Sequence, residues 1–155
     1  LIYVVYKNRL NFMQICDSFC FALPLAQAIG RWGNFFNSEA FGRPTNLPWG
    51  VYIPVENRPE QYINSSFFQP TFLYESVLDL VIFCVLILLQ KTKKIKTGNL
   101  TAIYFILYSI VRILVESIRI DCTTFVFGIP APIVVSAIII IVSCFYLFKN
   151  SKISE

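Results

Sequence analysis

Hydrophobic residues along this chain gather into long runs that are separated by polar stretches. A bilayer core about 30 Å thick needs about 20 mostly apolar residues per helix, so each long run is a candidate membrane helix. Three runs qualify clearly, whereas the first one is interrupted by Asp17, Pro24 and Gln27. The predicted helices cover residues 12–29, 72–90, 100–118 and 129–148. We therefore predict an all-α, polytopic transmembrane bundle that forms a single domain over residues 1–155, with one long loop at residues 31–70.

The amino-acid composition supports a membrane protein. Hydrophobic residues make up 56% of the 155 positions and charged residues only 14%, whereas soluble domains average about 25% charged residues. The five cysteines show no Cys-x-x-Cys spacing and the chain has no histidine. This excludes a zinc or haem site built on imidazole, and we interpret the cysteines as small hydrophobic residues. No basic patch is interleaved with stacking aromatic residues in a soluble module, so we expect no nucleic-acid partner.

The lysines and arginines are distributed unevenly between the two sides of the predicted bundle. All lysines fall on the side that the positive-inside rule makes cytoplasmic: Lys7, Lys91, Lys93, Lys94, Lys96, Lys149 and Lys152. Apart from Arg9, the arginines fall in the long loop or in the outer half of a helix: Arg31, Arg43, Arg58, Arg112 and Arg119. We therefore predict that residues 31–70 face outward and that the C-terminus is cytoplasmic.

The first residues, 1–7, form an apolar run that ends in a lysine. A signal peptide has its charges before the apolar run, so this start is not one. It is similar to the cytoplasmic end of a preceding membrane helix, and we expect the sequence to be a piece of a longer protein.

A polar, glycine-punctuated stretch at residues 30–42 follows the first apolar run. It contains Arg31, whose planar guanidinium group suits phosphate, together with Asn34, Asn37, Glu39 and the flexible backbone of Gly42. One interpretation is a glycine-rich turn whose polar side chains cap one another. The other is a functional site, because polar residues at a membrane segment are by default functional candidates.

The third apolar run carries a row of polar side chains. Tyr108, Arg112, Glu116 and Arg119 fall within roughly 80° of one another on a helix that turns about 100° per residue. Arg112 and Glu116 can pair at i, i+4, which fits a charge-neutralised seam that holds a bundle together. Arg119 adds a cation that invites an anion such as a lipid phosphate, although Asp121 offers it an alternative partner.

Three further carboxylates lie in or near the apolar runs. Glu75 begins the second run, where it either lines a cavity beside Tyr74 or favours the positive end of the helix dipole. Asp17 and Asp79 lie within apolar runs, and the sequence names no partner for them.

Residues 30–42 contain the pattern Gly-Arg-x-Gly-Asn-Phe-x-Asn-x-Glu-x-x-Gly, which resembles the signature of bacterial prolipoprotein diacylglyceryl transferases. Further landmarks follow in the order that this family shows: residues 43–45 with 47–50, residues 70–75, and the helix that carries Tyr108, Arg112, Glu116 and Arg119. The resemblance therefore covers nearly the whole chain.

This resemblance implies an integral enzyme of the bacterial cytoplasmic (inner) membrane whose partners are phosphatidylglycerol, a prolipoprotein and membrane lipids. Such an enzyme transfers the diacylglyceryl group to the thiol of the lipobox cysteine and releases glycerol phosphate, without a metal or another cofactor. The implied catalytic residues are Arg31, Glu39, Tyr108 and Arg112. The implied phosphatidylglycerol-binding residues are Arg31, Asn34, Asn37, Gly42, Arg112, Glu116 and Arg119. Arg112 would stabilise the leaving phosphate, Tyr108 would position the donor lipid, and Glu116 and Arg119 would orient Arg112 or gate lipid access.

Two departures from the family pattern affect this interpretation. The family has a histidine-containing His-Gly-Gly segment, a candidate general base, on a helix upstream of the residues seen here. Gln69 stands where the family often has histidine, and a glutamine cannot take up a proton near neutral pH, which suggests a peripheral role there. Two alternatives stay open: a transport-type membrane protein that binds an anionic lipid or solute through its arginines, and a non-catalytic remnant that binds lipid or a partner.

Overall fold

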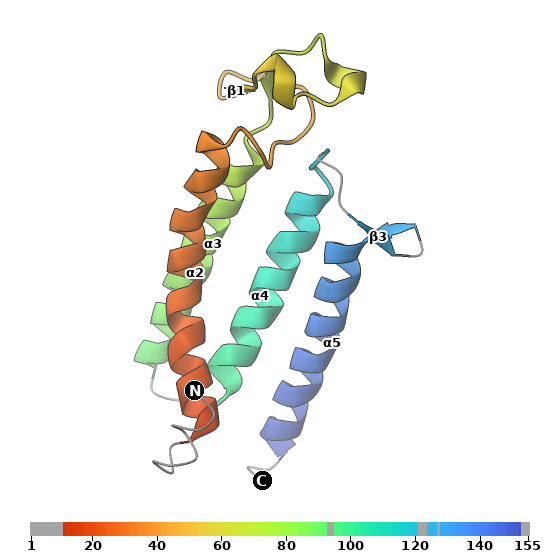
Figure 1. Cartoon of the computed structure of the whole chain (residues 1–155). Coiled ribbons are helices and arrows are strands. Elements are labelled where there is room, and N and C mark those ends of the chain that lie inside the picture. Colours follow the sequence, from red (N-terminus) through yellow and green to blue (C-terminus); the bar gives the residue numbers. More distant parts are fainter. Residues whose placement is uncertain (1–10, 93–94, 121–123, 127, 153–155) are drawn as a thin grey trace.

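A computed structural model of the protein describes residues 11–92, 95–120, 124–126 and 128–152. Its long helices are α2 (Phe12–Phe36), α3 (Thr71–Lys91), α4 (Asn99–Glu116) and α5 (Ala131–Lys152). Each of them is long and apolar enough to cross a membrane, and together they form the bundle in Figure 1. The predicted all-α, polytopic class is thereby confirmed. Lys7, Arg9, Lys93, Lys94, Asp121, Cys122 and the first apolar run lie outside the described residues.

Helix α2 continues beyond residue 29, where the sequence predicted its end, and reaches Phe36. The prediction was wrong here because Gly30 and Gly33 were interpreted as turn residues, although both lie within the helix. Asn37 caps the helix, with its backbone N–H donating to the carbonyl groups of Gly33 and Phe35. The signature stretch therefore begins on the last turns of a helix, and the long loop begins at residue 37.

The other helix ends differ less from the prediction. The last helix begins at Ala131 instead of residue 129, because Ile129–Pro130 (β4) pairs with Phe125–Val126 (β3) in a short antiparallel hairpin. Helix α4 ends at Glu116, two positions before the predicted end at residue 118. Helix α3 extends one residue further at each end than the predicted 72–90.

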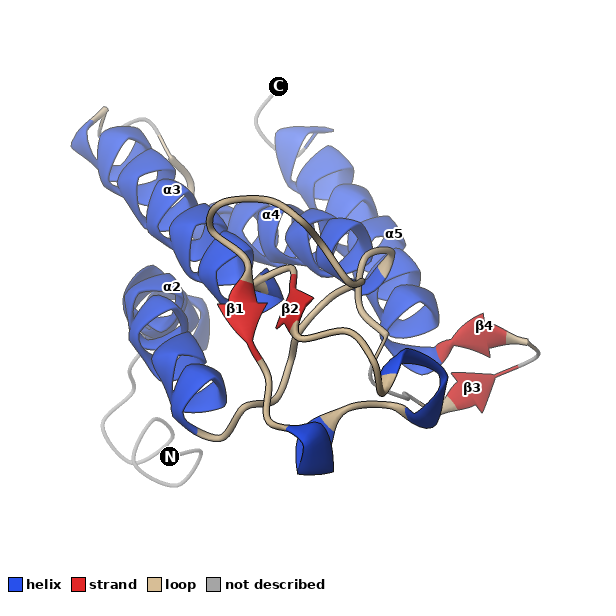
Figure 2. Cartoon of the chain, turned by 90° about the horizontal axis from the view of Figure 1, so that it is seen from above, coloured by secondary structure: helices blue, strands red, loops and turns tan. Residues whose placement is uncertain are grey.

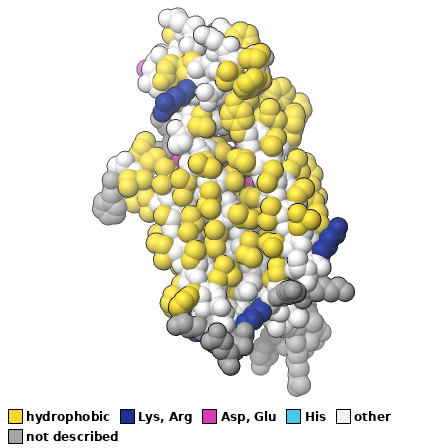
Figure 3. Space-filling model, turned by 180° about the vertical axis from the view of Figure 1, so that it is seen from behind, with side chains coloured by type: hydrophobic (Ala, Val, Ile, Leu, Met, Phe, Trp, Pro, Cys, Tyr) yellow, Lys and Arg dark blue, Asp and Glu magenta, His cyan; other side chains and the backbone are white. Residues whose placement is uncertain are grey.

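Neighbouring helices pack in the order α2, α3, α4 and α5, and α2 also contacts α4. The core shared by α2, α3 and α4 contains these buried residues: Cys20, Ile82, Leu86, Leu100, Tyr104, Val111 and Val115. The outer surface is apolar as well, with Ile141 and Phe145 of α5 more than two-thirds exposed, at 69% and 68%. Figure 3 shows hydrophobic side chains over most of one face of the bundle. Such a surface suits contact with lipid chains.

The long loop folds over one end of the bundle (Figures 1 and 2). Strands β1 (Val51–Tyr52) and β2 (Phe67–Phe68) pair antiparallel, and two short 3₁₀ helices, η1 (Val55–Asn57) and η2 (Glu60–Tyr62), lie between them. The loop has its own small core of Phe41, Ile53 and Phe68. A β-bridge between Gly42 and Arg119 ties it to the segment that follows α4. The loop is therefore fixed relative to the helices that carry the charged residues.

At the opposite end of the bundle, Asp17 of α2 caps helix α4. Its carboxylate accepts hydrogen bonds from the backbone N–H of Gly98 (2.7 Å) and of Thr101 (2.9 Å) and from the Thr101 hydroxyl (2.6 Å). The first N–H groups of a helix have no partner within it, so this carboxylate satisfies donors that a membrane would leave unpaired. Asp17 therefore has a structural role that its position in the sequence does not reveal.

Candidate functional site

Helices α2, α3 and α4 bring two arginines onto one buried carboxylate. Glu75 of α3 is 1% exposed, and its oxygens accept hydrogen bonds of 3.0 and 3.2 Å from Nη1 of Arg112 on α4. Nη2 of Arg31 on α2 forms an ion pair with the same carboxylate. A single negative group thus holds two guanidinium groups side by side, and we call Arg31, Glu75 and Arg112 the arginine cluster.

Tyr108 and Glu116 complete the surroundings of this cluster. The Arg112 guanidinium pairs with Glu116 one turn along α4 at 3.1 Å, so the i, i+4 pair that the sequence allows is formed. Arg31 donates a second, longer hydrogen bond of 3.4 Å to the Tyr108 hydroxyl. The Tyr108 ring stacks on Tyr104 with centroids 5.9 Å apart. The polar face predicted for this helix therefore points toward α2 and α3.

The charges of the cluster balance within a region that excludes most water. Arg31 and Arg112 supply two positive charges, and Glu75 and Glu116 supply two negative ones. The arginine side chains keep 20% and 14% of their surface exposed, whereas both carboxylates are nearly inaccessible. An incoming anion can therefore reach the guanidinium groups but must compete with Glu75 for them. Electrostatic interactions are strong in such surroundings, because the effective dielectric constant is low.

Asn34, Asn37 and Glu39 lie beyond the cluster, where α2 gives way to the loop. The backbone N–H of Glu39 donates to the Asn34 carbonyl at 3.0 Å, and the Asn37 side chain donates to the Glu39 carboxylate at 3.2 Å. Ser38 and Ala40, on either side of Glu39, have positive φ angles of 52° and 55°, which non-glycine residues seldom adopt. After this tight turn, the exposed Glu39 side chain lines an open pocket together with Glu56 and Arg58.

Gly42 and Arg119 face each other where the loop meets the end of α4. A Cβ on Gly42 would lie 3.0 Å from methyl groups of both Ile118 and Thr71 and 3.1 Å from Cβ of Gln69. Its N–H donates to the Gln69 carbonyl at 2.8 Å. Any larger residue would press against these three groups, so glycine favours close packing of the loop on the bundle. Gln69 also takes part in this packing through its main chain.

The structure thus groups the site residues predicted from sequence into three sets, one of which is the Gly42–Arg119 bridge. Arg31, Tyr108, Arg112 and Glu116 meet inside the bundle, whereas Asn37 and Glu39 contact each other at its end. Within the described residues, no hydrogen bond or ion pair joins Glu39 to Arg31 or Arg112.

Glu75 is the residue that sequence reasoning left out of the site. The sequence allowed either a cavity residue or a charge at the helix dipole, and burial against two arginines favours the former. Its position within an apolar run was the available signal.

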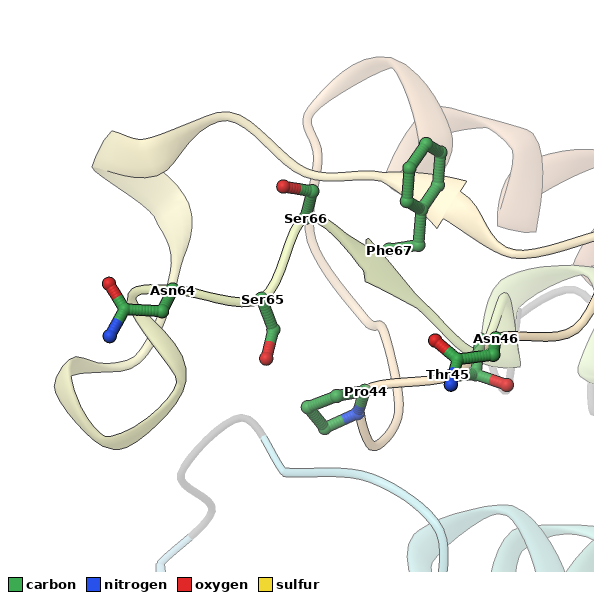
Figure 4. A pocket seen from close by; sticks show the side chains of 7 residues that line it. All are labelled: Pro44, Thr45, Asn46, Asn64, Ser65, Ser66 and Phe67. Atoms are coloured by element: carbon green, nitrogen blue, oxygen red, sulfur yellow. The ribbon is translucent and has the colours of Figure 1, made fainter.

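A separate polar pocket opens within the loop, as Figure 4 shows. It has a volume of about 390 Å³ and is lined by Pro44, Thr45, Asn46, Asn64, Ser65, Ser66 and Phe67. Its amide and hydroxyl groups can form hydrogen bonds, but none of the lining residues carries a charge. The pocket therefore lacks the guanidinium groups with which the arginine cluster can hold a phosphate.

Comparisons with known proteins agree with the signature. The family model described as prolipoprotein diacylglyceryl transferase matches residues 1–149. A phosphatidylglycerol–prolipoprotein diacylglyceryl transferase of Thermotoga maritima is 48% identical over 148 residues, which cover 94% of this chain and 50% of that protein. The protein of the same name from a Synechocystis species is 52% identical over 119 residues, covering 74% of this chain and 42% of that protein. The chain thus spans about half the length of the curated relatives it matches.

Proposed function

Since the chain belongs to the prolipoprotein diacylglyceryl transferase family, we propose that it takes part in attaching lipid to prolipoproteins. The donor is phosphatidylglycerol, and the acceptor is the thiol of the lipobox cysteine. The sulfur forms a bond to the glyceryl carbon while the bond from that carbon to the phosphate oxygen breaks. The phosphate leaves with the bonding electrons as glycerol phosphate, and the proton that the thiol gives up passes to this phosphate, so that charge and atoms balance.

The observation that carries this proposal is the convergence of Arg31 and Arg112 on one carboxylate. Two guanidinium groups held side by side match the oxygens of a phosphate, which each can bind through two parallel N–H groups. Negative charge grows on the phosphate as it leaves, and preorganised donors stabilise that charge without reorganising. The two arginines would therefore bind the donor lipid and promote its cleavage.

The neighbouring residues would prepare the arginines for this task. The hydroxyl of Tyr108, already bonded to Arg31, would position the lipid phosphate, and Glu116 would orient Arg112. Four further residues that the family resemblance implies, nearer the loop, would bind phosphatidylglycerol beside them: Asn34, Asn37, Gly42 and Arg119. The exposed carboxylate of Glu39 would act in catalysis from the same end of the bundle.

The proposed location is the bacterial cytoplasmic membrane, with the loop outside and the C-terminus inside. Lys91 and Lys149 lie at the ends of α3 and α5, away from the loop that carries Arg43 and Arg58. Lysine and arginine concentrate in the cytoplasmic segments of membrane proteins, which supports this orientation. The arginine cluster, one helical turn into α3 from the loop, would then lie near the outer lipid headgroups.

A reconstituted transfer assay tests the proposal. Vesicles that contain phosphatidylglycerol and a lipobox peptide would receive this chain, the Thermotoga maritima relative, or a chimera in which the chain replaces the matching residues of that relative. We expect a diacylglyceryl mass gain on the peptide with the chimera, measured by mass spectrometry. A properly inserted chimera that gives no mass gain, while the relative does, would contradict the proposal.

A further inference from the structure

Asp79 is a buried carboxylate that no neighbour satisfies. It lies one helical turn from Glu75 on α3 and is 0% exposed. Neither of its oxygens has a hydrogen-bond partner in the described part of the chain, and no other buried side chain there shares this property. Buried polar groups are normally hydrogen-bonded because an unpaired one costs free energy. Asp79 therefore requires an explanation that packing does not supply.

The groups around Asp79 determine which form of its carboxyl group is stable. The charged and titratable groups that face it are Glu75 on α3, Arg31 on α2, and Tyr104, Tyr108 and Arg112 on α4. Both arginines are already balanced by the carboxylates of Glu75 and Glu116. An ionised Asp79 would thus be a buried negative charge without a cation of its own, which is strongly unfavourable. The neutral acid avoids this cost and carries a proton that it can donate.

Binding of a phosphate at the arginine cluster creates a need for such a donor. The phosphate has to take over guanidinium N–H groups that Glu75 now occupies. Glu75 would then be a buried carboxylate that has lost its partners, and leaving a charged group unsatisfied is costly. Side chains at i and i+4 are neighbours on a helix surface. Asp79 is therefore within reach of the released carboxylate.

We propose that Asp79 is a positioning residue that stays protonated and donates a hydrogen bond to Glu75 once a phosphate group binds both arginines. No proton is transferred in this step, because the proton stays on Asp79 and only its hydrogen bond to Glu75 is new. The inference rests on the proposed function, since the phosphate is that of the donor lipid. It adds a residue outside the sequence signature to the lipid-binding site.

Two substitutions at one position test this inference. Asp79→Ala removes the donor, whereas Asp79→Asn replaces it with a neutral amide that donates in the same place. We expect Asp79→Ala to weaken phosphatidylglycerol binding by the chain in detergent about tenfold or more, as loss of a hydrogen bond to a charged group does. Asp79→Asn should restore most of the affinity. Native mass spectrometry with increasing phosphatidylglycerol measures both.

Further readouts separate this role from a structural one. Asp79→Ala should not lower the thermal unfolding temperature without lipid, because the acid has no hydrogen-bond partner among the described residues. In the chimera, Asp79→Ala should raise KM for phosphatidylglycerol more than it lowers kcat. The pH profile of transfer by the Asp79→Asn variant should match that of the wild type across the neutral range.

Several results would overturn the inference. Wild-type affinity in Asp79→Ala would show that the donor is not used. Equal losses in the alanine and asparagine variants would show that an ionised carboxylate is required. A wild-type chain that binds no phosphatidylglycerol, together with a chimera that transfers none, would contradict the proposed function and this inference with it.

Discussion

At the scale of single residues, Arg112 is held between two carboxylates. Its guanidinium group binds Glu75 with one nitrogen and Glu116 with another. Both partners are almost completely buried, so the guanidinium plane is held in one orientation. Preorganisation of this kind lets a donor stabilise charge at the moment it develops. Arg31 on α2 binds the Glu75 carboxylate and the Tyr108 hydroxyl. It thereby adds a second guanidinium donor beside that of Arg112.

Replacement of Arg112 tests this function directly. We expect Arg112→Ala to lower the rate of transfer by about a hundredfold or more, the range seen when one donor to a developing anion is removed. Arg112→Lys keeps the charge but lacks the planar fork, so its rate should be intermediate. Turnover in the chimera and the amount of protein in the membrane fraction are the measurements. Near-normal turnover in a properly inserted Arg112→Ala variant would remove Arg112 from the mechanism.

At the scale of elements, the contact between the loop and the bundle depends on side-chain size. A Cβ added to Gly33 on α2 would have no neighbouring atom within 4 Å. A Cβ added to Gly42 would instead contact residues at the start of α3 and just after α4. Two glycines of one signature therefore have different physical requirements. The first lies on an open helix face, and the second allows the loop to approach the bundle.

Alanine substitutions at the two glycines should separate these requirements. Gly42→Ala has to displace methyl groups 3.0 Å away, and we expect it to destabilise the protein by about 1 to 3 kcal/mol, as overpacking does. Gly33→Ala, the matched control, should be neutral or stabilise by up to about 1 kcal/mol, because alanine favours a helix. Thermal unfolding in detergent measures both. Equal effects of the two substitutions would contradict the packing role of Gly42.

At the scale of the whole molecule, basic side chains are distributed unevenly between the two ends of the bundle, which supports the proposed orientation. The loop and the arginine cluster lie toward one end, and the described lysines lie at the other. Phosphatidylglycerol bound at the cluster would place its phosphate near that first end and its acyl chains along the apolar helix surfaces.

Cysteine labelling tests the orientation. In a background that lacks the five native cysteines, Asn57→Cys in the loop should react with a membrane-impermeant maleimide on intact spheroplasts. Lys149→Cys near the end of α5 should react only after the membrane is opened, because the proposed orientation, which follows the positive-inside rule, has it in the cytoplasm. The reverse pattern would overturn the proposed orientation, and labelling of both sites on intact spheroplasts would overturn the assignment of opposite sides.

The sequence by itself was sufficient to predict the class of fold and part of the site. The length of each apolar run, compared with the thickness of a bilayer, predicted the four membrane helices, because hydrophobicity and helix length are local properties. The helical period placed Tyr108, Arg112 and Glu116 on one face, and the structure has them there. The signature in residues 30–42 identified the family, and the comparisons confirm it.

The tertiary structure decided which of these residues meet. Glu75 became the centre of the site because α2 and α4 each present an arginine to it, a contact between residues far apart in the sequence. Asp17 became a helix cap and Gly42 a packing residue for the same reason. The predicted end of α2 was too early, because the signature glycines were interpreted as turn residues. A continuous helix tolerates glycine at a small cost in free energy. Burial and pairing depend on what lies across the bundle, and no local pattern contains that information.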